Sequence, residues 1–239
     1  MLIFIPWLSF AKFNQFFYNT MKITVLSDIH GKIENIEKIS GELTESDLVL
    51  ICGDITHFGK GKEAQQVITK IAKFQPNILA VTGNCDYPEV EHFLLKEGIS
   101  LTKQSTIFEG VGFVGLGGSL PCPGQTPNEF TEAEFEESLS IAFSSLYQSI
   151  PALLVVHHPP FDTATDISKS GKHVGSVAVR KSIETFRPLA CVCGHIHESK
   201  GKSKIEGTFV INPGPFKEGN YALVKINHGL IEAIHLSSF

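Results

Sequence analysis

The sequence lacks the features that mark membrane proteins and proteins that bind nucleic acids. Its apolar beginning, MLIFIPWLSF, has no basic start, is too short to span a bilayer and is followed by no small-residue cleavage site. Positive charge is not in excess, because the formal net charge is -5, and the summed field is mildly repulsive toward polyanions. We therefore expect a cytoplasmic protein without stable membrane insertion, and we do not expect duplex nucleic acid as a partner.

Cysteine is scarce and its pattern excludes two kinds of site. The five cysteines form an odd count and contain no paired C-x-x-C knuckles, so neither a disulfide framework nor a zinc ribbon is indicated. Cys191 and Cys193 are two residues apart in an apolar run, a spacing that places both on one face of a strand. The sequence predicts reduced, buried thiols.

Two catalytic motifs are also missing. No G-x-S-x-G nucleophile elbow occurs, which argues against a serine hydrolase of that type. No G-x-x-x-x-G-K-[ST] loop occurs either, which argues against nucleotide-driven phosphoryl transfer.

The chain has the length and composition of one ordinary globular domain. It has 239 residues, of which 42% are hydrophobic and 19% charged, enough for one sizeable core. A clean strand opens at Met21 and Lys22, so residues 21–239 are predicted to form a single domain. Residues 1–20 are interpreted as an apolar extension, a mis-assigned start or a loosely attached tail, rather than a signal peptide or membrane anchor.

From residue 22 the pattern alternates between apolar runs and helical stretches. The runs ITVLS, DLVLIC and NILAVTG alternate with helical segments near 33–41 and 62–74, and a further helix is expected to begin near Pro88. This rhythm predicts three parallel strands with crossover helices. Two short strands around Gly110 indicate antiparallel additions to the sheet.

The second half continues with strands and turns. A helix is predicted near 131–145, followed by the buried strand ALLVV, a long polar loop over 161–175, and a helix that leads into the strand LACVC. The runs TFVIN, YALVKI and LIEAIHL are expected to form further strands.

Polar side chains with metal-ligand chemistry follow five of these apolar strands. They are Asp28 and His30, Asp54, Asn84, His157, and the pair His195 and His197. Each motif alone has an ordinary explanation, such as a capping Asp, an Asn in a turn or solvated loop histidines. Ligands of α/β sheets bind at the carboxyl ends of strands, so the five motifs together predict a metal site there.

The ordered set D28-x-H30, G53-D54, G83-N84, H157-x-P-P and G194-H195-x-H197 resembles the calcineurin-like metallophosphoesterases, in a branch that carries G-N-C-D. The resemblance spans residues 21 to about 215. It implies an α/β fold of two packed mixed β-sheets flanked by helices, with metals at the strand ends.

Position by position, the resemblance implies two divalent ions. Asp28, His30, Asp54 and His197 would hold one ion, and Asn84, His157 and His195 would join a bridging Asp54 around the other. Ligands of this mixed kind suit Mn, Fe, Ni or Zn, among which the sequence does not choose. Two such ions clamp the phosphoryl oxygens and activate water, so no side-chain nucleophile is needed.

One position departs from the common family pattern, and it concerns the proton for the leaving group. The family's Asn is commonly followed by a His, whereas this chain has Cys85. Cys85 as a weak donor, Cys85 as a packing residue, His158 as the donor, and a metal-bound water all stay open. His158 is otherwise a candidate contact to a metal ligand or to substrate, and a purely structural role is the alternative. The candidate catalytic residues are therefore Asp54, Asn84, Cys85 and His158.

Two further residues are candidates at the edge of the site. His173, in the loop GKHVGS ahead of a helix start, is a candidate substrate contact, although capping by Ser176 explains the loop as well. Asn212 in INPGP resembles a motif that closes the family's site region, and a Pro-Gly turn is the alternative. Substrate choice is expected to depend on the loops 121–130 and 161–175.

The leading hypothesis is a two-metal hydrolase of phosphomonoesters or small phosphodiesters, with a small phosphate ester as its partner. A metal-binding scaffold without activity is the alternative, and the complete ligand set argues against it. A nuclease ranks third, because the chain has little room for extra DNA-binding segments. The sequence does not specify the oligomeric state.

Overall fold

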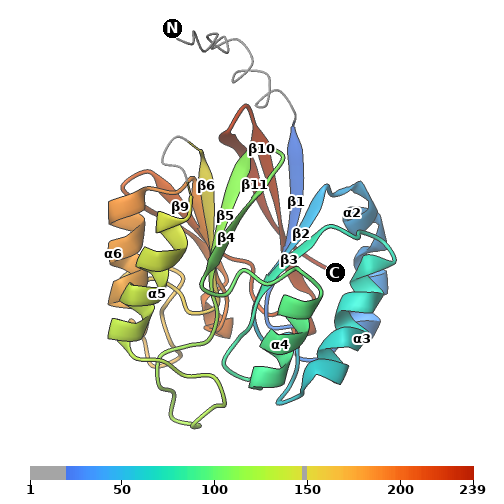
Figure 1. The fold of residues 1–239 in the computed structure, drawn as a ribbon, viewed down its shortest axis with the longest axis horizontal. Helices are drawn as coiled ribbons and strands as arrows, with labels where there is room; N and C mark the ends of the chain where they lie inside the picture. The colour runs from blue at the N-terminus through green and yellow to red at the C-terminus, as the bar shows by residue number, and fades with distance from the viewer. Residues whose placement is uncertain (1–19, 147–149) are drawn as a thin grey trace, which may run out of the picture.

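The computed structural model describes residues 20–146 and 150–239, which form two β-sheets packed face to face between outer layers of helices (Figure 1). The first sheet contains, in spatial order, β11 (Leu230–Ser238), β10 (Asn220–Asn227), β1 (Met21–Leu26), β2 (Leu48–Cys52) and β3 (Ile78–Val81). The second contains β4 (Gln104–Phe108), β5 (Val111–Leu116), β6 (Ala152–Val156), β7 (Ala190–Val192), β9 (Thr208–Asn212) and β8 (Gly201–Ile205). This architecture confirms the predicted fold class.

The helices lie on the two outer faces. The first sheet is covered by η2 (Ile33–Ile39), α2 (Ser40–Glu45), α3 (Gly61–Ala72) and α4 (Pro88–Lys96), and the second by α5 (Glu132–Ser144) and α6 (Val177–Phe186) (Figure 1). Two short 3-10 turns, η3 (His197–Ser199) and η4 (Phe216–Glu218), connect later strands.

The parallel core of each sheet follows from strands that are apolar on both faces. β1, β2 and β3 run parallel, as the sequence predicted, and every residue of β2 is buried. In the second sheet β5, β6, β7 and β9 also run parallel. β4 pairs with β5 in antiparallel fashion around Gly110, as expected.

Two elements differ from the sequence prediction. The stretch near 33–41 is a 3-10 helix followed by α2, and its isoleucines recur every third residue, a spacing that a 3-10 helix places on one face. The strand β8 was not predicted, because its sequence GKSKI is mostly polar. Its outward side chains lie at the sheet edge beside β9, so it needs no apolar run.

The core has three layers, one between the sheets and one under each group of helices. Cys191 in β7 and Cys193, which directly follows the strand, both lie in the layer under α5 and α6, which confirms that they point to the same face of the sheet. All the cysteines are free, and only Cys122 is not buried. The predicted extension at 1–20 lies outside the described residues, except for Thr20. No helix in the described ranges is long and apolar enough to cross a membrane.

Candidate metal centre

The carboxyl ends of β1, β2, β3, β6 and β7 meet at one edge of the sandwich. Contacts between side chains of the two sheets show this convergence: His157 Nε2 lies 3.6 Å from Asp54 Oδ1, and His197 Nε2 lies 3.1 Å from Asp28 Oδ1. Residues that are more than a hundred positions apart in the chain therefore face each other across the sheets.

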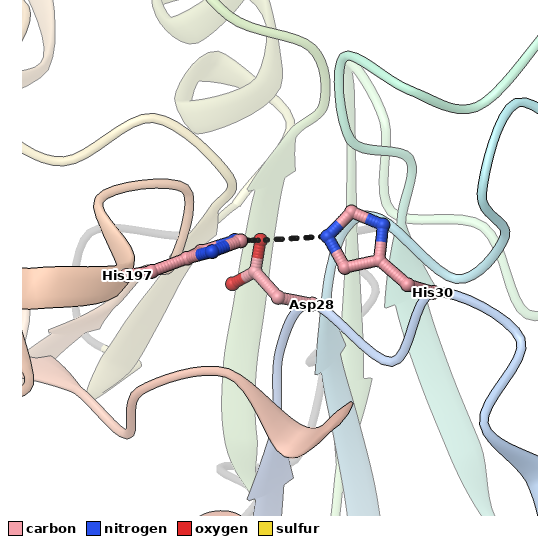
Figure 2. A group of neighbouring side chains, drawn as sticks. All are labelled: Asp28, His30 and His197. Carbon is pink, nitrogen blue, oxygen red and sulfur yellow. Dashed lines mark hydrogen bonds and ion pairs between the residues drawn. The ribbon is translucent and has the colours of Figure 1, made fainter. Parts of the chain in front are cut away.

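Asp28, His30 and His197 form one group of ligand atoms, all within 4.8 Å of one another. Figure 2 shows the Asp28 carboxylate between the two imidazole rings. Ser27 Oγ donates to Asp28 Oδ2 at 2.6 Å, and the backbone N–H of His195 donates to the same oxygen at 3.2 Å. Burial alone would raise the pKa of Asp28, but the hydrogen bond from His197 and the charge of His157 outweigh it and lower the pKa below its ordinary value.

A second group joins Asp28, Asp54 and His157 within the same distance limit. Asn84 and His195 lie beside it: Asn84 Oδ1 is 2.9 Å from His157 Nε2, and the rings of His157 and His195 have centroids 5.1 Å apart. All the candidate ligands named from the sequence are thus brought to this edge of the sandwich.

Asp54 belongs to the second group and also approaches His30 of the first. Its Oδ2 is 3.6 Å from His30 Nε2, and its Oδ1 is 3.6 Å from His157 Nε2. Burial raises the pKa of Asp54 to about 6, although the charge of His157 opposes the shift. Ionising this buried carboxylate is costly unless a cation lies beside it. The position of Asp54, with one oxygen toward His30 and the other toward His157, therefore suits a ligand shared by two metal ions.

The hydrogen bonds of His157 provide a test of whether a cation fits. Nδ1 faces the carbonyl oxygen of Cys52 at 2.7 Å and must donate to it, because a carbonyl only accepts. In the neutral ring Nε2 then carries a lone pair, and it faces the Asn84 carbonyl oxygen, which is also an acceptor. With the Asn84 amide in this orientation, a proton or a metal ion between the two acceptors would satisfy both, so a divalent cation fits these residues.

His30 supports the same conclusion. Within the described part of the chain, both of its ring nitrogens are buried and have no hydrogen-bond partner. Burial lowers the pKa of His30 to about 4, so the ring is neutral at physiological pH and keeps a lone pair for a metal. An unpaired polar atom inside a protein is costly, and a metal ion would satisfy it.

The backbone is strained where it carries the ligands. Asp28, His30, Asp54 and His195 have φ angles of 54°, 47°, 49° and 66°, in the left-handed region. Asp and His tolerate this region better than most residues, but such conformations cluster at functional sites, where the surroundings hold them in place.

Two glycines allow the ligand turns to pack closely. A Cβ at Gly83 would lie 2.1 Å from Asp54 Oδ1, and one at Gly194 would lie 1.7 Å from Ser27 Oγ and 2.7 Å from Asp28 Oδ2. Gly83 and Gly194 are therefore needed because any larger side chain would collide with a residue that follows another strand.

Sequence reasoning did not assign a role to Asp86 or Asn128. The buried carboxylate of Asp86 accepts hydrogen bonds from the backbone N–H groups of Ile55, Thr56 and Gly83. Asn128 Nδ2 donates to the Gly83 carbonyl oxygen at 2.9 Å. The acidic end of the G-N-C-D run was the available signal for Asp86, whereas no local signal marked Asn128.

A third unassigned residue is Cys122, in the loop 117–131. Its Sγ lies 3.6 Å from His195 Nε2 and 3.2 Å from the Leu120 carbonyl oxygen. The thiol therefore borders the candidate ligand His195.

The candidate proton donors lie in different surroundings. Cys85 Sγ lies within 4.8 Å of ligand atoms of His30 and Asp54, and burial raises the pKa of its thiol. His158 Nε2 donates to the Val174 carbonyl oxygen at 3.0 Å, and burial lowers its pKa to about 4. The ring of His158 packs against that of His195, with centroids 4.9 Å apart.

His173 and Asn212 have structural partners. His173 Nδ1 lies 2.7 Å from Asp166 Oδ1, a hydrogen bond that raises the pKa of His173. Its polar contacts among the described residues are with Asp162 and Asp166, so the structure does not join it to the ligand groups. Asn212 Nδ2 donates to the Ile196 carbonyl oxygen at 2.9 Å and so holds the turn between His195 and His197.

Comparisons with known proteins agree with this geometry. A family model described as calcineurin-like phosphoesterase matches residues 21–199. An uncharacterized protein of Methanocaldococcus jannaschii is 39% identical over 199 residues, which cover 82% of this chain and 88% of the relative.

Solved structures share the fold. A protein of Thermus thermophilus matches with a TM-score of 0.72 at 19% identity, covering 92% of this chain and 99% of that chain. A purple acid phosphatase of yellow lupin (Lupinus luteus) matches with a TM-score of 0.57 at 10% identity, covering 92% and 54%, and an archaeal phosphodiesterase with 0.53 at 16%, covering 92% and 100%. The family model, which matches most of the chain, confirms the resemblance found in the motifs: the chain belongs to the calcineurin-like phosphoesterase family, a family of metal-dependent phosphoesterases.

Proposed function

We propose that the protein hydrolyses phosphomonoesters or small phosphodiesters at two divalent metal ions. The observation that carries the proposal is that Asp54 approaches candidate ligands of both ions, with Oδ2 3.6 Å from His30 Nε2 and Oδ1 3.6 Å from His157 Nε2. When bound, two such ions supply an activated water and neutralise charge on the phosphoryl oxygens.

In this proposal the protein's own residues have distinct tasks. Asp28, His30, Asp54 and His197 would hold one ion, and Asp54, Asn84, His157 and His195 would hold the other. The bond from His157 Nδ1–H to the Cys52 carbonyl oxygen orients that ring, as outer partners of metal-binding histidines do. Ser27 orients Asp28 in the same way.

Neither candidate donor offers a labile proton at neutral pH. Burial raises the pKa of the Cys85 thiol, and the nearby Asp54 charge raises it further, so the thiol is a weak acid. His158 is neutral above pH 4 and its N–H is already used by Val174. A metal-bound water remains as the donor. A side-chain general acid contributes about 10²–10⁴-fold, and in its absence we expect esters with poor leaving groups to react at least about 100-fold more slowly than p-nitrophenyl esters.

The test of the proposed function is turnover of aryl phosphate esters. Manganese-loaded protein is assayed with bis- and mono-p-nitrophenyl phosphate beside an Asp54→Ala control, and we expect cleavage by the wild type only. If the wild type cleaves neither ester above the control, the proposed hydrolase activity is wrong. The leaving-group preference is tested with methyl p-nitrophenyl phosphate, whose hydrolysis releases either p-nitrophenol or methanol. We expect release of p-nitrophenol to dominate.

A further inference from the structure

The loop between Asp54 and α3 carries two exposed aromatic side chains that the proposed chemistry does not use. The ring of His57 meets the ring of His30 edge-on, with centroids 5.3 Å apart. The ring of Phe58 meets that of His57 in the same way at 5.1 Å. Phe58 is 47% exposed, so a line of rings leads from a candidate metal ligand to solvent.

This loop is held rigidly. Asp86 accepts hydrogen bonds from the backbone N–H of Ile55 at 3.1 Å and from the N–H and Oγ1 of Thr56 at 2.8 and 2.7 Å. The N–H of Gly59 donates in turn to Thr56 Oγ1 at 3.1 Å. Buried bonds thus fix the backbone on both sides of His57 and Phe58.

Phe58 is held in an unfavourable conformation. Its φ is 54°, in the left-handed region that is uncommon for a bulky side chain. Single exposed apolar residues are ordinary on protein surfaces and need no explanation. Phe58 differs because a strained, well-anchored backbone presents it to solvent, and because its ring is linked through His57 to a His30 ring whose nitrogens have no partner in the described structure.

We propose that the ring of Phe58, which meets His57 edge-on, is a stacking face for a flat aromatic ring in the organic part of the phosphate ester, and that Phe58 is a specificity-determining residue. The inference rests on the proposed function, since the phosphate group would lie at the metal centre beside His30. An aromatic face recognises any flat ring through stacking, without reading hydrogen bonds, so the substrates are aryl or nucleobase-bearing phosphate esters.

The experiment compares two phosphate analogues that differ only in the flat ring. Binding of the phosphonate analogues of adenosine 5′-monophosphate and ribose 5-phosphate, in which a C–P bond replaces the hydrolysable ester bond, to manganese-loaded protein is measured by calorimetry. We expect the adenine to improve Kd by about tenfold in the wild type, the size typical of one stacked base. Phe58→Ala and Phe58→Leu should bring the two Kd values within about twofold, since neither replacement is flat, and Phe58→Trp should keep the difference.

The matched control is Phe186→Ala. Phe186 is 42% exposed, similar to Phe58, but it ends α6 and so lies at the beginning of β7, opposite the edge that carries His195. This variant should keep the wild-type ratio. The proposal is overturned if the wild type binds both compounds equally or binds neither, or if Phe58→Leu keeps the ratio while its unfolding temperature matches the wild type. Because binding is read without turnover, failure here is distinguishable from failure of the hydrolase activity.

Discussion

At the scale of single residues, the histidines after β6 have opposite electrostatic situations. The charge of Asp54 raises the pKa of His157 against the effect of burial, whereas burial lowers the pKa of His158 to about 4. His157 therefore lies where a positive charge is favourable, whether a proton or a metal ion supplies it. His158 is a neutral ring that holds the loop 161–175 through its hydrogen bond to the Val174 carbonyl oxygen.

His158 should make folding stability depend on pH. The unfolded chain protonates this residue below pH 6.5, whereas the folded protein does so only near pH 4, so the unfolded state binds more protons between these values. Stability should therefore fall as pH falls from 6.5 to 4, by about 3 kcal/mol from this residue. Urea unfolding in EDTA measures the slope.

His158→Gln keeps an N–H for Val174 but does not titrate, so its stability should depend less on pH over that range. The exposed His92, replaced by Gln, is the matched control and should behave as the wild type. Parallel pH curves for wild type and His158→Gln would show that His158 is not the group responsible.

At the scale of elements, the strand-to-loop turns decide the geometry of the metal centre. Each turn packs against the ligand of a neighbouring strand, as the contact between Gly83 and Asp54 shows. Asp86 then ties the turn after β2 to the turn after β3. The ligands are therefore positioned by one another's backbones, and a small change in one turn displaces a side chain on the next strand.

Gly83→Ala should damage the centre without removing a ligand. The added Cβ would lie 2.1 Å from Asp54 Oδ1 and 2.2 Å from the backbone nitrogen of Asp54, so both the carboxylate and the turn that carries it must shift. A displacement of about 1 Å at a catalytic site costs about 100-fold in rate, so we expect a loss of this size in aryl ester hydrolysis. Metal analysis of the dialysed protein should show reduced occupancy.

Gly41→Ala, in α2, is the matched control, because a Cβ there has nothing within 4 Å and its backbone is not in the left-handed region. Its activity and metal content should equal those of the wild type. Equal activity of both variants would mean that the close approach at Gly83 does not position Asp54.

At the scale of the whole molecule, the candidate ligands come from both sheets. Asp28, Asp54 and Asn84 follow strands of the first sheet, whereas His157 and His195 follow strands of the second. Metal ions bound between them would connect the two halves of the sandwich. Since the unfolded chain does not hold these ligands together, binding would stabilise the folded state.

Metal should therefore raise the unfolding temperature. Free ion at a hundred times Kd stabilises by about 2.7 kcal/mol, which for a domain of this size corresponds to roughly 5–10 °C. Thermal unfolding with manganese and with EDTA measures the shift. Asp54→Asn should lose most of it, and Glu97→Gln, a change at an exposed carboxylate, should keep it. A shift that is the same in both variants would place the bound metal elsewhere.

The sequence by itself determined the parallel strands and the residue types that follow them. Apolar runs such as LVLIC specify buried strands, and the motifs after them named the candidate ligands from Asp28 to His197. These features are local, because hydrophobic periodicity and turn residues act over a few positions. The 3-10 helix at 33–39 and the edge strand β8 were not predicted. A three-residue spacing of isoleucines does not by itself distinguish a 3-10 helix from an α-helix, and a short polar segment does not by itself indicate a strand.

Only the tertiary structure decided how these residues are used. The donation from His157 to Cys52, the anchoring of the turns by Asp86 and the contact of Phe58 with His57 beside His30 depend on which loops meet at the edge of the sandwich. His158 could be a proton donor in the sequence, but its N–H is used by a carbonyl that lies 16 residues later. Ring orientation, burial and pKa are set by packing between distant segments, and no local pattern encodes that packing.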